Sequence, residues 1–201
     1  MELRIEQLNF EYASHPLFQQ FNLTLPAGVT WLRGENGAGK TTLLKLAGGA
    51  LTPHAGQIWL DQIEIHAQPL AYRLHCYYCG GDTPQLPWLT VRDMLDLHIG
   101  LYPGTDTGLL NAELAAFHLV PTLDQPVTTL SLGQHKKMQL ALALSLPVRL
   151  LLIDEPFNGL DVDAVAYLRQ QLSAPQRLAR QVIVLTSHLA PELPLTQTVQ
   201  L

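Results

Sequence analysis

The sequence predicts an α/β fold with a mostly parallel sheet, an N-terminal antiparallel β region and a small helical subdomain. The apolar runs within residues 149–153 (RLLLI) and 181–187 (QVIVLTS) are typical of strands buried on both faces, as in parallel sheets. Residues 3–33 read instead as three short strands, the last two separated by a turn at Pro26 and Gly28. The middle of the chain is dominated by helical periodicity, which predicts a helical insert in an α/β core.

Each element follows from a local pattern. A short helix after residue 39 is closed by Gly48 and Gly49, and Thr90 with Asp93 has the spacing of a capping box at the start of a helix. We expect one domain over residues 1–201, in which 1–82 and 147–201 form the α/β core and 83–146 the helical subdomain. The remaining expected elements are a small hairpin at 57–65, a buried strand at 74–79, helices at 107–120, 132–146 and 162–172, and a short tail after residue 188.

Composition narrows the class of protein. The 201 residues are 47% hydrophobic and carry a net charge of −5, yet no apolar run reaches the roughly 18 residues that a membrane span needs. The N-terminal segment, MELRIEQLNFEY, contains acidic and alternating polar residues and does not resemble a secretory signal, so we expect a cytoplasmic protein. Twelve scattered Lys and Arg residues form no basic stripe, which argues against nucleic acid as the main partner.

The two cysteines, Cys76 and Cys79, form a single C-Y-Y-C. A structural zinc site needs about four ligands, and a redox C-x-x-C normally opens a helix. The aromatic residues around this pair instead indicate a buried strand. We therefore expect two reduced thiols in the core and neither a metal site nor a redox pair.

Residues 34–41, GENGAGKT, match the phosphate-binding pattern G-x-x-x-x-G-K-[ST]. Glycines let backbone N–H groups turn toward phosphate oxygens, Lys40 adds a charge for the β- and γ-phosphates, and the Thr41 hydroxyl is a Mg²⁺ ligand. The pattern follows a predicted strand and precedes a predicted helix, which predicts a P-loop NTPase core that binds a nucleoside triphosphate and Mg²⁺. The expected nucleotide-binding residues of this phosphate loop are Gly34, Glu35, Asn36, Gly37, Ala38, Gly39, Lys40, Thr41 and Thr42.

Two carboxylates end the apolar strand at 149–153. Ligands of parallel sheets bind at the carboxyl ends of the strands. We therefore expect Asp154 to hold Mg²⁺ and Glu155 to orient or deprotonate the attacking water, although such a pair is by itself often a solvated turn. His188 ends another strand and is a candidate hydrogen-bond donor to the transferred phosphoryl group, with Glu155, His188 and Lys40 as the expected catalytic residues.

A second glycine turn lies at residues 130–137, LSLGQHKK. Ser131 offers a hydroxyl, Gly133 a bare backbone, and the helix that follows has a dipole that attracts phosphate. The alternative is an ordinary serine-capped helix with two solvated lysines. The turn alone does not decide between these interpretations.

Taken in order, these motifs resemble those of the ATP-binding cassette (ABC) ATPases, the nucleotide-binding subunits of membrane transporters. Tyr12 is similar to the aromatic residue that stacks on adenine, with Phe10 as an alternate. GENGAGKT resembles the Walker A motif, LLLIDEP the Walker B motif, NGLD at 158–161 the D-loop, and His188 the switch histidine. LSLGQ resembles the family signature, with Leu132 where glycine is usual.

The resemblance implies a function for the second glycine turn. In this family the signature binds the γ-phosphate of ATP held by the opposite subunit of a head-to-tail dimer, which would involve Ser131, Gly133 and Gln134. It also implies Mg²⁺-dependent ATP hydrolysis that drives transport through separate integral membrane permease subunits, with export as one direction. The chain would then lie on the inner face of the membrane, bound through that partner, and a homodimer is expected. Among these ATPases, the chain looks most like the small cytochrome c maturation proteins.

One family motif is missing. Members carry a glutamine between a core strand and the helical insert; here Asp82 stands near that place as a Mg²⁺ ligand candidate, and Gln85 lies three residues later. The missing glutamine leaves open a regulatory module that binds ATP but hydrolyses it poorly. A separate alternative is a soluble ABC ATPase of translation or DNA maintenance, although two cassettes in one chain or a long coiled-coil insert would not fit 201 residues and a short insert. Nearby Trp88 is predicted either to contact the membrane partner or to pack in the core.

Overall fold

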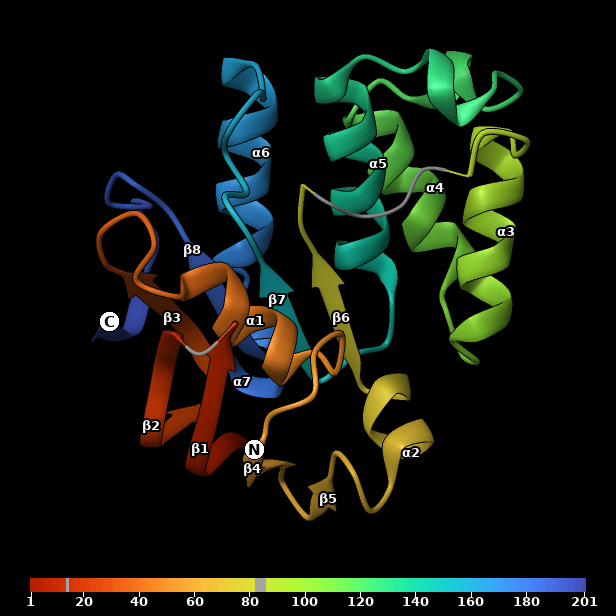
Figure 1. Cartoon of the computed structure of the whole chain (residues 1–201). Helices are drawn as coiled ribbons and strands as arrows, with labels where there is room; N and C mark the ends of the chain where they lie inside the picture. The colour runs from red at the N-terminus through yellow and green to blue at the C-terminus, as the bar shows by residue number, and fades with distance from the viewer. Residues whose placement is uncertain (14, 82–85) are drawn as a thin grey trace. The chain divides into compact units, whose positions relative to one another are not determined.

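Two β-sheets organise the first part of the molecule (Figure 1). The computed structural model describes residues 1–13, 15–81 and 86–201. An antiparallel sheet has the order β2–β1–β4–β5, formed by β1 (Glu2–Tyr12), β2 (His15–Pro26), β4 (Ala55–Leu60) and β5 (Ile63–Glu64). The alternating buried and exposed residues of β1 place Leu3, Ile5 and Leu8 on the buried face. The predicted N-terminal antiparallel region is thus confirmed.

The second sheet has the order β6–β7–β8–β3–β9. Its strands are β3 (Gly28–Arg33), β6 (Cys76–Cys79), β7 (Leu150–Ile153), β8 (Val182–Thr186) and β9 (Leu195–Gln200). β3 is parallel to both β8 and β9, and β7 is parallel to β8. Every residue of β7 and β8 is buried, as their continuous apolar sequences predicted. β9 was expected only as a tail, because its polar, half-exposed residues give no apolar run.

The core of this part of the chain joins the helix after the phosphate loop to both sheets. Helix α1 (Lys40–Ala47) buries Leu43, Leu44 and Leu46 in a hydrophobic cluster with residues of β1, β4, β7 and β8. Two helices of six residues, α2 (Pro69–Leu74) and α7 (Pro175–Arg180), were not predicted from the sequence. Each begins at a proline, which suits the first turn of a helix, but is too short for its periodicity to be read.

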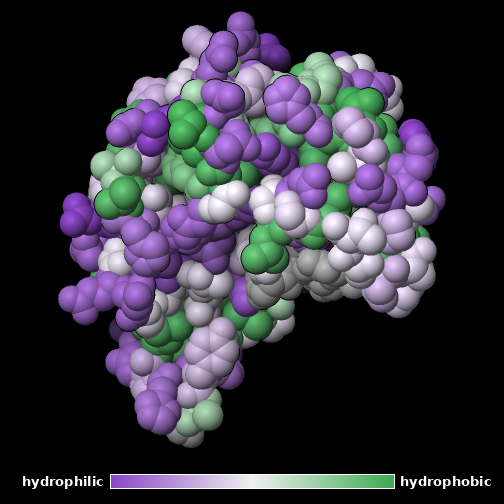
Figure 2. Space-filling view, turned by 90° about the horizontal axis from the view of Figure 1, so that it is seen from above, coloured by the Kyte–Doolittle hydropathy of each residue, from purple (hydrophilic) through white to green (hydrophobic). Residues whose placement is uncertain are grey.

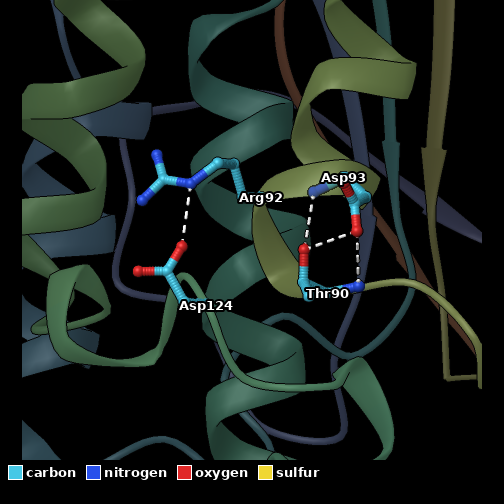
Figure 3. A network of polar contacts seen from close by, with 4 residues as sticks. All are labelled: Thr90, Arg92, Asp93 and Asp124. Atoms are coloured by element: carbon cyan, nitrogen blue, oxygen red, sulfur yellow. Dashed lines mark hydrogen bonds and ion pairs between the residues drawn. The ribbon is translucent and has the colours of Figure 1, made fainter.

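The helices of the middle region are α3 (Val91–Leu101), α4 (Thr107–Ala116) and α5 (Leu132–Ser145), with short 3₁₀ turns at Val120–Thr122 and Val127–Thr129. The predicted capping box at α3 is present: Thr90 Oγ1 accepts from the Asp93 amide and Asp93 Oδ2 accepts from the Thr90 amide (Figure 3). Beside it, Arg92 Nε donates to Asp124 Oδ1 at 3.0 Å, which ties α3 to the loop before α5 (Figure 3).

The chain forms two compact units. The first contains residues 1–78, 148–154 and 172–201, and the second contains 79–147 and 155–171. Helix α6 (Val162–Leu172) therefore groups with α3–α5. One reason is a buried contact: the Tyr167 hydroxyl of α6 donates to Glu113 of α4 at 3.0 Å, and its ring packs edge-on against Phe117. The division into a catalytic core and a helical arm stays a prediction.

Exposed apolar residues and the cysteines test further expectations. On the face in Figure 2, hydrophobic side chains lie in small groups among hydrophilic ones. Trp88 is 74% exposed, which contradicts core packing at that position.

Cys76 and Cys79 are buried thiols, and burial raises the pKa of Cys76 to about 12, so this thiol stays protonated. Within residues 1–13, 15–81 and 86–201, no helix has the length and apolar composition for a membrane crossing.

Candidate nucleotide-binding site

The phosphate loop connects β3 to α1 and belongs to the first unit. Gly39 is the residue before α1 and has a φ of +97°, a conformation that favours glycine. A Cβ there would lie 3.0 Å from Phe18 Cζ and 3.1 Å from Leu17, so a larger residue would also have to displace these side chains slightly. Because Gly39 has no side chain to cap the helix, the first-turn amides of α1 are left for a ligand.

Lys40 is held inside this loop. Its side chain is buried, and its Nζ donates to the carbonyl oxygens of Gly34 and Glu35 at 2.8 and 2.9 Å. A lysine ammonium fixed among backbone groups is a preorganised point charge for phosphate oxygens. The geometry therefore places the predicted cation at the centre of the glycine loop.

Asp154 is bound by two hydroxyl groups from neighbouring elements. Thr41 Oγ1, in the first turn of α1, donates to Asp154 Oδ2 at 2.6 Å, and Thr186 Oγ1, at the end of β8, donates to Asp154 Oδ1 at 2.5 Å. Thr186 was not predicted from the sequence. The feature that could have indicated it is its position at the carboxyl end of β8. Leu185 of β8 pairs with Ile153 of β7, so Thr186 and Asp154 follow paired residues of neighbouring strands.

The oxygen atoms of Thr41 and Asp154 are the kind of ligands that Mg²⁺ prefers. Over the described parts of the chain, no cluster of three or more His, Cys, Asp or Glu side chains could hold a metal. A hydroxyl and one carboxylate fit a Mg²⁺ ion that takes its other ligands from phosphate and water, as is usual for this ion. Asp82 and Gln85, the candidates for the missing glutamine, lie outside the described residues.

The two aromatic candidates for stacking on a base differ in exposure. Tyr12 is 50% exposed, whereas Phe10 is buried between Tyr12 and His54, with ring centroids 4.8 and 5.5 Å away. The Tyr12 hydroxyl lies 3.4 Å from Thr42 Oγ1, beside the phosphate loop. Of the two rings, that of Tyr12 is far more exposed and is the better candidate for stacking. His54, which the sequence did not single out, lines a cavity of about 680 Å³ with Phe10 and Phe18.

His188 lies near Gly34 and Glu35, the first two residues of the phosphate loop. It lines a cavity of about 370 Å³ together with Gly34 and Glu35. The same cavity contains Arg33, whose guanidinium stacks over Trp31 at 5.2 Å from the ring centroid. The cavity thus places His188 beside the first residues of the phosphate loop, while its role toward the transferred phosphoryl group stays a prediction. Arg33 is a further cation there that sequence patterns did not indicate.

The signature turn, residues 130–137, is part of the second unit. Ser131 caps α5: its Oγ accepts from the Gln134 amide at 3.2 Å, and Gln134 Oε1 accepts from the Ser131 amide at 2.9 Å. The serine-capped helix proposed as the plain alternative is therefore present. Since the Ser131 hydroxyl acts as an acceptor in this bond, its hydrogen remains able to donate to a phosphate oxygen. Leu132 beside it is 86% exposed.

Glu155 opens the second segment of the same unit and has a φ of +49°, which is strained for a residue with a side chain. The following turn is closed by the Asn158 amide, which donates to the Glu155 carbonyl at 3.3 Å. This turn ends at Asp161, whose pKa is lowered to about 2, chiefly by the hydrogen bond from Lys137 and then by that from the Ala164 amide.

Comparisons with known proteins agree with these features. The model of a family described as "ABC transporter" matches residues 18–158. A curated protein of Legionella pneumophila (strain Lens), "Cytochrome c biogenesis ATP-binding export protein CcmA", is 34% identical over 97% of this chain and 96% of its own. The solved "Structure of ATP binding subunit of ABC transporter" is 27% identical, with a TM-score of 0.85 over 94% of this chain and 80% of the other.

A further solved structure shares the fold at 20% identity, with a TM-score of 0.77 over 92% of this chain and 88% of the other. It is the "Dimeric structure of a post-hydrolysis state of the ATP-binding cassette MJ0796 bound to ADP and Pi". At this identity the likeness concerns the fold alone.

Proposed function

The chain belongs to the ABC transporter ATP-binding subunits, which are ATPases, and from this premise we propose which of its residues bind and hydrolyse ATP. The observation that carries the proposal is the bonding of Asp154 to Thr41 and Thr186 beside a buried Lys40. The Thr41 hydroxyl and the Lys40 ammonium of α1, with the Asp154 carboxylate at the end of β7, are the kinds of group that phosphoryl transfer from ATP requires.

In this proposal the first unit binds the nucleotide. Tyr12 stacks on the adenine, the amides of Gly34 to Thr42 and the Lys40 ammonium surround the phosphates, and Thr41 and Asp154 hold Mg²⁺. When bound, this ion would neutralise charge on the phosphate oxygens. His188 donates to the transferred group from its cavity beside Gly34 and Glu35.

Glu155 acts on the attacking water, as its place directly after the Mg²⁺ ligand Asp154 suggests. Its left-handed backbone supports a functional role, because strain of this kind is retained where it positions a reacting group. Ser131, Gly133 and Gln134 complete the site of a second copy of the chain. The dimeric MJ0796 cassette supports this arrangement only by analogy of fold.

The similarity to CcmA proteins supports the finer assignment. We propose that the chain powers an export system related to cytochrome c biogenesis, working as a homodimer on separate membrane subunits at the cytoplasmic face. Trp88, an exposed aromatic residue of the second unit, is the contact proposed for the membrane partner.

Glu155→Gln tests the proposed reaction. The amide has the shape of the carboxylate but cannot act as a base, so turnover of ATP by the full chain should fall on the order of 100-fold or more. Binding of a fluorescent ATP analogue should be unchanged, and an ATP-bound dimer should accumulate in size-exclusion chromatography. Wild-type turnover by this variant would remove Glu155 from the mechanism, and a wild-type chain that binds ATP without hydrolysing it would indicate a regulatory module.

A further inference from the structure

An ion pair within the second unit links the signature turn to the Glu155 loop, which we define as residues 155–161. Lys137 Nζ, on α5, donates to Asp161 Oδ2 at 2.5 Å. The Lys137 side chain is only 13% exposed, although Asp161 is 57% exposed. Exposed ion pairs contribute little because both side chains remain mobile. Here the cation is packed against the protein, so the pair fixes where the end of the loop lies.

A backbone contact joins the same two segments independently. A Cβ added to Gly133 would lie 2.8 Å from the Gly159 carbonyl oxygen, closer than real Cβ atoms approach. The first turn of α5 therefore packs directly on the backbone of the Glu155 loop. This contact gives Gly133 a structural reason to be glycine, in addition to the phosphate contact expected from the signature.

The loop transmits this restraint toward Glu155 through a series of short-range contacts. Asp161 Oδ1 accepts from the Ala164 amide at 2.9 Å and so caps α6, and Arg169 of that helix lies over the Phe157 ring at 5.3 Å. Amide-to-carbonyl bonds then connect Leu160 to Phe157 and Asn158 to Glu155. Glu155 itself has the strained φ of +49°, a conformation that persists only when its surroundings impose it.

We propose that Lys137 is a positioning residue for ATP hydrolysis, which acts through Asp161 to hold the Glu155 loop against the signature turn. The inference rests on the proposed function of Glu155. Its consequence is that Glu155 and Ser131 are fixed to one another in each chain. Since Ser131 is proposed to serve the nucleotide of the second copy, the Lys137–Asp161 pair would couple the geometry of the two sites of the dimer.

The test compares Lys137→Met with Lys137→Arg in the full chain. Methionine keeps the apolar stem but removes the charge, so kcat should fall about 10-fold or more while KM for ATP changes less than about 2-fold, since a misplaced catalytic group affects turnover and not binding. Arginine keeps the pair and should restore most of kcat. In the nucleotide-free chain, amide hydrogen exchange at 156–161 should be faster in Lys137→Met.

Two further variants separate positioning from general stability. Asp161→Asn keeps the helix cap but loses the ion pair, and combining it with Lys137→Met should lower kcat no further than either change alone. Arg92→Met removes another ion pair of the same unit, that with Asp124 (Figure 3), and should alter neither kcat nor exchange at 156–161.

The outcomes distinguish the two proposals. Unchanged loop exchange or unchanged kcat in Lys137→Met would overturn the role of Lys137. Additive losses in the double variant would do the same, because they would show that the two residues act separately. A wild-type chain that does not hydrolyse ATP would instead overturn the proposed function, and the exchange data would still show whether Lys137 holds the loop.

Discussion

The two glycine turns of this chain both open a helix, but they are built in opposite ways. Helix α1 begins after Gly39, which has no side chain to cap it, and the buried Lys40 is already turned into the loop. Helix α5 begins after Ser131, and a complete capping box with Gln134 satisfies the amides of Ser131 and Gln134. The phosphate loop thus leaves its donors for a ligand, whereas the signature turn folds as an ordinary capped helix.

This difference explains why the proposed roles of the two turns differ. A loop with uncommitted amides and an internal ammonium can bind phosphate within one chain. In the signature turn, the Ser131 hydroxyl hydrogen and the exposed Leu132 side chain remain able to contact a ligand. These two groups alone would bind a ligand only weakly. We therefore propose that the signature turn acts on a phosphate that another copy of the chain already holds.

The largest expected effect is at the phosphate loop. Lys40→Ala should weaken binding of a fluorescent ATP analogue and lower ATP turnover by about 100-fold or more, because the charge inside the loop is lost. Lys45→Ala, at the other end of α1, is the matched control and should retain both properties. Normal ATP binding by Lys40→Ala would mean that the loop amides suffice and that the comparison drawn here is wrong.

Ser131→Ala should keep ATP binding by the single chain but lower turnover about 10-fold or more, since it removes the proposed donor to the γ-phosphate. A mixture of equal amounts with Lys40→Ala sharpens the test. Half of the random dimers are then hybrids with one intact site, so about a quarter of the wild-type sites should return. If ATP turnover of the mixture only equals the sum of the turnovers of the two variants measured separately, Ser131 does not act on the nucleotide of the second copy.

The cap of α5 can be separated from its proposed catalytic role. Ser131→Asp retains a capping oxygen and should melt near the wild-type temperature, whereas Ser131→Ala should lose about 1 kcal/mol, or about 2–4 °C in Tm. Neither variant has a side-chain hydrogen that could donate to phosphate, because aspartate is ionised, so turnover should fall at least as far in Ser131→Asp as in Ser131→Ala. If turnover instead followed Tm, the serine would act only as a helix cap.

The smallest effect concerns pH. His135, in the first turn of α5, has its pKa lowered by burial and by the charge of Lys136. The unfolded chain, with a histidine pKa near 6.5, binds the proton more readily. This stability contribution is therefore present above about pH 6.5 and is lost as the pH falls through the lower pKa of the folded state.

His135→Gln should remove that dependence. Between about pH 7.5 and 5.5 its Tm should fall less than that of the wild type, by at most about 2 °C. His75 is shifted in the same direction by burial and Arg149, so it contributes equally to both proteins and its effect cancels in the comparison. An identical pH dependence of the two Tm values would contradict the assignment to His135.

Much of the fold and of the candidate site could be predicted because the evidence is local. The apolar residues of β7 indicate a buried parallel strand wherever they pack, and the glycines and Lys40 of the phosphate loop are required by the loop itself. The same holds for the capping residues Thr90 and Ser131, whose partners are three residues away. Short or half-exposed elements such as α2, α7 and β9 carry too few periodic positions for this kind of inference.

The sequence by itself determined the nucleotide chemistry of this protein, since its motifs consist of residues close together in the chain. Only the tertiary structure decided which distant residues support them. Thr186 reaches Asp154 through strand pairing, Tyr167 brings α6 to α4, and Lys137 reaches Asp161 across 24 positions. Such contacts depend on how separate elements pack, and packing leaves no fixed spacing in the sequence from which the partner of a side chain could be recognised.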